Sequence, residues 1–324
     1  MRSITSCLAA AAIVAYCSFI APAIAQGTTS SVRFIYPSAA GSSGDALTRL
    51  IADQIRSRFS QTAIVENRAG GASRLSLLAV KTAQPDGATL LLTQMAPMTL
   101  FPHVQKVLDY DPVADFTPIA QAATFEFGIA VNRDIPVKTP QELLQWLKAN
   151  PHKATFGGPG SGGLPHFFGL LVGQAAGVEM THVPYKGTAQ IITDLLGGQV
   201  PMMVALASDL APLHKDGRLR VIATSDSERF AELSDVPTFK ESGIDIVGRG
   251  WFAIYGPANM APATVKRLNT TIVSILQSPE IRQRITALGL KPTGSTAAEL
   301  AAIQKADSAR WGPVIKASGF TLEQ

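Results

Sequence analysis

Apolar and polar positions along the first third of the chain follow the alternation of a parallel β/α unit. Apolar runs of strand length occur at 32–36, 62–65 and 88–93. Between them lie two segments with helical spacing, one opened by Asp45 with Leu47, Leu50 and Ile51 on one face, the other ending near Ala83. This β-α-β-α-β order predicts a parallel sheet covered by helices.

The same order returns after an irregular connector at 109–118. Strands are expected at 119–122, 127–131, 154–156, 180–183, 200–205, 219–223 and 247–255, and helices at 140–149, 167–176, 189–196, 263–276, 279–288 and 297–317. The segment Thr139-Pro140-Gln141-Glu142 has the form of a capping box. Two rounds of alternation predict two α/β lobes, and the late strand through Trp251 predicts that the chain crosses between them twice.

A glycine-rich stretch between an expected strand and helix is the strongest candidate site. It reads Gly157-Gly158-Pro159-Gly160-Ser161-Gly162-Gly163-Leu164-Pro165-His166. Such a turn lets the backbone approach a ligand and aims free N–H groups at it, and the helix dipole adds positive potential. We therefore expect an anion there, although a flexible connector would have the same composition.

A second small-residue loop, from Pro37 to Asp45, precedes the first helix. Asp45 and Arg49 form an i, i+4 pair. The two residues stabilise the helix end or contact the ligand directly, and the sequence leaves both roles open. Two such loops facing each other across a cleft would hold a carboxylate through backbone donors.

The N-terminus has the features of a secretory signal peptide. Arg2 precedes an apolar run from Leu8 to Ile20, and Ala23-Ile24-Ala25 matches a small-x-small cleavage site. Both cysteines, Cys7 and Cys17, lie in this segment, so the mature chain would have no disulfide. Removing Arg2 changes the formal net charge from +4 to +3, which gives no nucleic-acid footprint.

Three enzymatic or metal-binding readings are disfavoured. The segment from Gly158 to Gly163 formally matches the G-x-G-x-x-G pattern of dinucleotide binding, but the strand before the loop is short and a proline lies within the loop. Ser161 and His166 lack the nucleophile elbow of a hydrolase. The other histidines have no metal-ligand spacing, so we expect neither a metal nor a cofactor; they are His103, His152, His182 and His214.

Short segments along almost the whole mature chain form a pattern that is specific in number, order and spacing. They are Pro37–Arg49, Val65-Glu66-Asn67-Arg68-Ala69-Gly70, and 85–87, 110–112, 115–118, 156–166, 182–187, 195–200, 236–238, 241–243 and 251–257. On these segments the chain resembles the periplasmic solute receptors of tripartite tricarboxylate transporters, the Bug-type binding proteins.

The resemblance implies an α/β, two-lobed type II periplasmic-binding-protein fold with two interlobe crossovers. Lobe I would comprise residues 26–125 plus 247–324, and lobe II residues 126–246, after a signal peptide at 1–25. Backbone amides and ordered water from the two loops would hold one ligand carboxylate. The expected ligand-binding residues are Ser38, Ala39, Ala40, Gly41, Ser43, Gly44, Asp45, Thr93, Gln94, Met95, Gly160, Ser161, Gly162, Gly163, His166, Tyr185, Ala205 and Ser208.

The chain departs from the family pattern at three places. Ser42 replaces a usual glycine, Pro201 replaces a usual aspartate, and 93–100 is unusually apolar, with Met95, Met98 and Leu100. We take these apolar residues to favour a carboxylate with a hydrophobic or aromatic body, with core packing as their alternative role.

The resulting expectation is a periplasmic, monomeric, non-enzymatic receptor that delivers a small carboxylate to membrane transporter subunits. A sensory receptor for a two-component system and a secreted hydrolase are the alternatives. The sequence does not separate transport from sensing.

Overall fold

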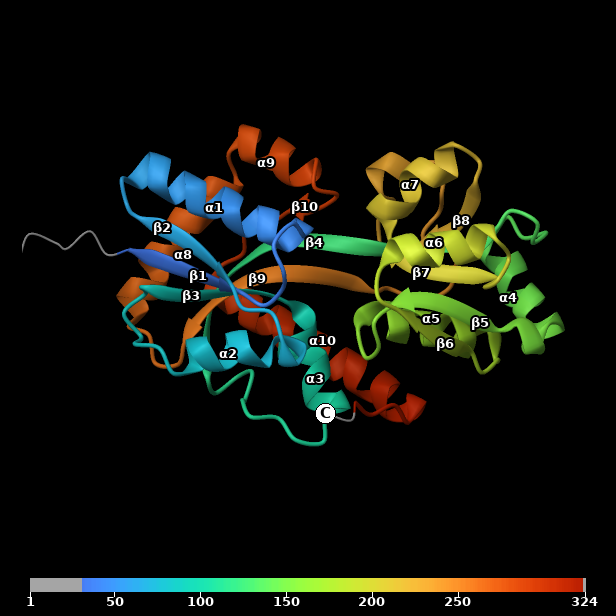
Figure 1. The fold of residues 1–324 in the computed structure, drawn as a ribbon, viewed down its shortest axis with the longest axis horizontal. Helices are drawn as coiled ribbons and strands as arrows, with labels where there is room; N and C mark the ends of the chain where they lie inside the picture. Colours follow the sequence, from blue (N-terminus) through green and yellow to red (C-terminus); the bar gives the residue numbers. More distant parts are fainter. Residues whose placement is uncertain (1–30, 323–324) are drawn as a thin grey trace, which may run out of the picture.

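Residues 31–322 are described by a computed structural model, in which two α/β lobes lie side by side and are joined by long strands (Figure 1). The expected signal peptide, with Cys7 and Cys17, lies outside the described residues. Among the described residues, no helix is both long and apolar enough to cross a membrane.

The first sheet has the strand order β2-β1-β3-β9-β4. Its strands are β1 (Val32–Tyr36), β2 (Ala63–Asn67), β3 (Thr89–Gln94), β9 (Arg249–Pro257) and the first part of β4 (Phe116–Asn132), with β10 (Lys291–Pro292) beside β4. The first three strands are parallel, as the sequence predicts, and β9 runs antiparallel to β3. All residues of β3 except Gln94 are buried, because helices cover both faces of the sheet.

Helices pack on both faces of this first sheet. They are α1 (Ser43–Phe59), α2 (Arg74–Lys81), α3 (Phe101–Val104), α8 (Pro262–Leu276), α9 (Pro279–Thr286) and α10 (Ala297–Ser318). Side chains of α1, α8 and α9 form one apolar cluster with the sheet, and α2 and α10 contribute to another. The indole of Trp251 in β9 donates to Asp307 at 2.8 Å, which ties α10 to the returning strand.

The second sheet repeats the β/α alternation, as expected. Its strands are the second part of β4, β5 (Thr155–Pro159), β6 (Thr181–Tyr185), β7 (Met202–Leu206) and β8 (Leu219–Thr224), and its helices are α4 (Pro140–Ala149), α5 (Leu164–Ala176), α6 (Thr188–Leu196) and α7 (Ala207–Lys215). The Thr139 side chain accepts from the Glu142 amide, so the expected cap of α4 is confirmed. The sequence did not predict α7, because Pro212 lies inside it.

Strand β4 belongs to both sheets. Residues 116–126 pair with β9, and residues 127–132 pair with β7 and β8. The sequence predicts two separate strands here, and the structure has one of 17 residues. Residues 119–127 contain no glycine or proline, so the strand continues without a turn and changes only the strands with which it pairs.

The apolar segment after β3 is mostly core. Ala96–Leu100 forms a π-helical turn that leads into α3. Met98 and Leu100 are fully buried, so they take the packing role and not the cleft role considered for them.

Candidate ligand-binding cleft

The loop before α1 is held in shape by a buried carboxylate. Asp45 Oδ2 accepts from the Gly41 amide and from Arg49 Nε, both at 3.0 Å, and Oδ1 accepts from Asn67 Nδ2 at 2.8 Å. Asn67 Nδ2 also donates to the Ser38 carbonyl at 3.0 Å. Burial raises the pKa of Asp45, but these hydrogen bonds outweigh it and leave the pKa below its ordinary value. Asp45 therefore positions the loop, which is the helix-end role that the sequence left open.

Ser42 and Gly44 set the first turn of α1. Ser42 is the N-cap, and its Oγ accepts from the Asp45 amide at 3.3 Å and lies 3.0 Å from the Tyr36 hydroxyl. A Cβ on Gly44 would lie 2.2 Å from the Tyr36 hydroxyl and 2.5 Å from Phe252 Cε1. Glycine at this position lets the Phe252 ring pack directly on the helix start, where the first amides have no intrahelical partner.

The glycine-rich loop before α5 uses two left-handed residues. Gly160 and Gly162 have φ of +63° and +71°, which favours glycine. The Gly160 amide donates to the Tyr185 carbonyl at 2.9 Å, and the Gly162 amide donates to Nδ1 of His166 at 3.2 Å. Gly163 is the N-cap of α5, so the helix begins directly after the loop.

The starts of α1 and α5 meet at a cavity of about 280 Å³ between the lobes. Its lining residues are Ser43, Gln94, Met95, Ala96, Phe125, Phe127, Pro159, Gly163, Leu164, Pro165, Leu206 and Phe252. None of these residues carries a charge. The positive ends of two helix dipoles and the free amides of the helix starts are therefore the groups suited to an anion.

Four of the expected ligand-binding residues line this cavity: Ser43, Gln94, Met95 and Gly163. Thr93 and Ala205 are fully buried. The Tyr185 hydroxyl donates to Asp194 Oδ2 at 2.8 Å, outside the lining. Ser208 lies against Gly289 of the other lobe. The remaining expected residues belong to the two loops or to the first turn of α1 but do not line the cavity: Ser38, Ala39, Ala40, Gly41, Gly44, Asp45, Gly160 and Gly162.

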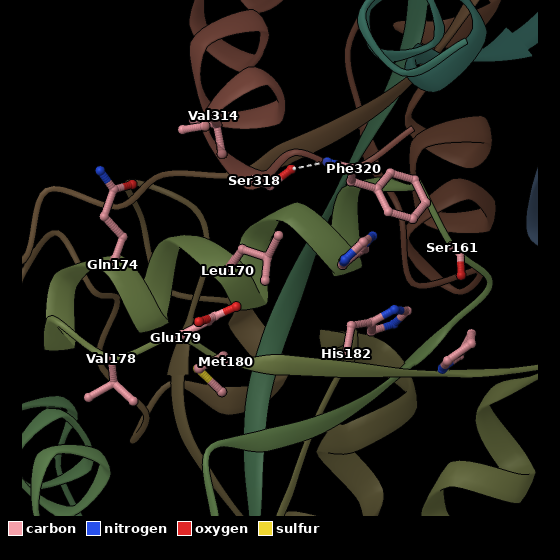
Figure 2. A pocket seen from close by; sticks show the side chains of 13 residues that line it. Ser161, Leu170, Gln174, Val178, Glu179, Met180, His182, Val314, Ser318 and Phe320 are labelled. Atoms are coloured by element: carbon pink, nitrogen blue, oxygen red, sulfur yellow. Dashed lines mark hydrogen bonds between the residues drawn. The ribbon is translucent and has the colours of Figure 1, made fainter. Parts of the chain in front are cut away.

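Ser161 and His166 line a different cavity of about 670 Å³, between α5, β6 and the end of α10. Figure 2 shows Val314, Ser318 and Phe320 across this cavity from His182 and Met180. The rings of His166 and His182 stack with centroids 4.2 Å apart.

Burial lowers the pKa of both imidazoles to about 4, and for His166 the neighbouring His182 adds to this effect. Both rings are therefore neutral near pH 7. Nδ1 of His166 is occupied by the Gly162 amide. Among the described residues, no hydrogen bond joins the Ser161 hydroxyl to either imidazole, so the Ser–His pairing of a hydrolase is not seen here.

The aromatic lining residues Phe125, Phe127 and Phe252 were not foreseen. Phe125 and Phe127 share one face of β4, since they are two residues apart in a strand. That alternation is visible in the sequence, but the face that opens onto the cavity depends on which strands pair with β4. Among residues 31–322, no group of three or more metal-ligating side chains could hold a metal ion.

Comparison with known proteins assigns the family. Residues 47–320 match the sequence profile of the tripartite tricarboxylate transporter family receptors. A UPF0065 protein of Cupriavidus necator is 34% identical over 261 residues, covering 81% of this chain and 79% of the relative.

Solved structures give the same assignment. The structure of R. palustris Rpa4515 with adipate has a TM-score of 0.78 and 28% identity, covering 90% of this chain and 98% of that one. MatC of Rhodopseudomonas palustris with bound malate has a TM-score of 0.73 and 25% identity, covering 88% and 98%. The fold, the two loops and these matches agree: the chain belongs to the receptor family of the tripartite tricarboxylate transporters, whose members are periplasmic solute-binding proteins.

Proposed function

We propose that this chain binds a small organic carboxylate in the cavity between its lobes and delivers it to membrane subunits of a tripartite tricarboxylate-type transporter. The observation that carries the proposal is the meeting of two helix starts, at Ser43 and Gly163, on a cavity whose lining has no charged side chain. Such a site suits one anionic group held by backbone donors. The adipate and malate complexes of its relatives support a carboxylate.

The protein would act in the periplasm as a monomer, after removal of residues 1–25. It would use no cofactor and catalyse no reaction, in keeping with a family of solute receptors. A sensory receptor for a two-component system would use the same cleft and remains the second candidate.

Binding would shift an equilibrium between open and closed lobes. We place lobe I at 26–125 plus 247–324 and lobe II at 126–246. This division is supported by the change of pairing partner in β4, which occurs between Glu126 and Phe127. The closed form would be the state that the membrane subunits recognise.

The proposal is tested on the mature protein by native mass spectrometry, followed by thermal-shift measurements with a panel of carboxylates. A stabilising acid that is recovered chemically unchanged is the expected result. Turnover of that acid, or stabilisation by nucleotides alone, would overturn the proposal. Uptake assays with and without the cognate membrane subunits separate transport from sensing.

A further inference from the structure

The inner surface of the cavity is aromatic. Phe125 and Phe127 come from β4 and Phe252 from β9. The Phe125 ring lies 5.7 Å from that of Phe127 at an interplanar angle of 84°, and 5.0 Å from that of Phe252 at 49°. These rings present both edges and faces, the arrangement that aromatic partners prefer. Met95 adds a thioether, which also packs favourably on aromatic rings.

The anion-binding end and the aromatic surface are in direct contact. The Cβ position of Gly44, in the first turn of α1, lies 2.5 Å from Phe252 Cε1. A carboxylate held at the start of α1 therefore places the atoms next to it against the Phe252 ring. On the other lobe, Gly163 and Leu164 bring the start of α5 to the same cavity.

Beyond the two helix starts, the lining provides no charged partner for a second carboxylate. Its only polar side chains are those of Ser43 and Gln94, and it contains no Lys, Arg or His. An ionised group buried among Phe side chains without a counter-charge is strongly disfavoured. A dicarboxylate would have to leave its second charge in this apolar part of the cavity.

The volume limits the body of the ligand. An apolar cavity of about 150 Å³ is enough to hold benzene. The 280 Å³ of this cavity therefore accommodates one ring together with a carboxylate and a short substituent.

We infer that the ligand is a monocarboxylate with a single aromatic ring, of the benzoate or phenylacetate type. Its carboxylate binds at the starts of α1 and α5, and its ring packs on Phe125, Phe127 and Phe252. This inference rests on the proposed receptor function and narrows it, since the ligands named for the two relatives, adipate and malate, are dicarboxylates.

Calorimetry of the mature protein with benzoate, phenylacetate, cyclohexanecarboxylate, hexanoate, adipate and citrate tests the inference. We expect the two aromatic acids to bind at least about tenfold more tightly than any other acid in the panel. Equal binding of hexanoate or cyclohexanecarboxylate would overturn the aromatic assignment. Tighter binding of adipate or citrate would overturn it as well, while leaving the receptor function intact. Binding of no carboxylate at all would count against the receptor function itself.

Two variants test the residues. Phe125→Leu should weaken benzoate binding about tenfold, because Phe125 is half-buried at the cavity and contacts both other rings. Phe230→Leu is the matched control, since Phe230 is also half-buried but lies away from the cavity. Equal effects of the two variants on benzoate binding would overturn the role of Phe125.

A gain-of-function variant completes the test. Gln94 is exposed at the end of β3 and lines the cavity. Gln94→Arg adds the missing counter-charge and should shift the preference towards adipate. A variant that still prefers benzoate over adipate by the original ratio would contradict the argument from charge.

Discussion

We expect removal of the Glu126 charge to make the protein more stable at neutral pH. Glu126 is the last residue of β4 that pairs with β9, opposite Arg249, at the point where the chain enters the second lobe. Its side chain is buried, and Oε2 has no hydrogen-bond partner among the described residues. Burial, and then the charge of Asp226, raise the pKa of Glu126 to about 7, although Lys291 partly opposes this.

The sign and size of the effect follow from the proton balance. The native state keeps the proton up to about pH 7, whereas the unfolded chain releases it near the ordinary value of 4.5. The native state binds more protons in this range, so the free energy of unfolding falls as pH rises from 4.5 to 7. At about 1.4 kcal/mol per pKa unit, less some solvent screening, the loss is about 2–3 kcal/mol above pH 7.

Glu126→Gln removes this loss while keeping the shape of the side chain. We expect the free energy of unfolding of the variant to exceed that of the parent by about 2 kcal/mol at pH 8 and to be nearly the same at pH 4.5. Urea titrations of the mature protein at pH 4.5, 6, 7 and 8, followed by circular dichroism, measure the difference.

Glu280→Gln is the matched control, because Glu280 is exposed on α9. It should give no comparable pH-dependent gain. A Glu126→Gln protein that is less stable than the parent at pH 8, or equally shifted at every pH, would refute the reasoning.

Three further predictions concern the loops and the second cavity. Gly41→Leu and Gly160→Leu should abolish ligand binding and lower the free energy of unfolding by about 1–3 kcal/mol, because both glycines have positive φ. Gly177→Leu is the control: Gly177 has a φ of +65° and open space around its Cβ position, so this variant should lose stability without losing binding. Calorimetry that finds unchanged affinity in both loop variants would contradict the two-loop site. Asp45→Ala should lower the free energy of unfolding by about 2–3 kcal/mol and weaken binding, because the Gly41 amide loses its acceptor. Urea unfolding equal to that of the parent would contradict the role of Asp45 in positioning the loop. His182→Phe should reduce the loss of stability that occurs as pH falls from 6.5 to 4. The unfolded chain protonates this imidazole near its ordinary pKa of 6.5, whereas in the folded chain its pKa is about 4, so acid favours the unfolded state. An unchanged pH profile of urea unfolding would contradict this prediction.

Local patterns in the sequence were sufficient for most elements and for the loops. Alternation of apolar runs gave the two β/α rounds, because strand and helix periods are properties of neighbouring residues. The glycines at 160 and 162 marked a loop that needs positive φ, and the structure has it there. The cap of α4 at Thr139 followed from residues three positions apart.

The long-range geometry could not be obtained in this way. His166 is part of the glycine-rich motif, yet its ring stacks on His182 and lines the second cavity, because α5 packs against α4 and the strands β5, β6 and β7, which are separate from it in sequence. Asp45 is fixed by Asn67, which lies 22 residues away on β2.

The character of the cleft was decided by the tertiary structure alone. The sequence determined two loops of small residues, each followed by a helix start, since capping and glycine content are local. The rings that cover the inner surface come from β4 and β9, strands more than 100 residues apart in the chain that meet as neighbours in one sheet. Which face of a strand opens onto a cavity depends on its pairing partners, and this information lies outside any local stretch of sequence.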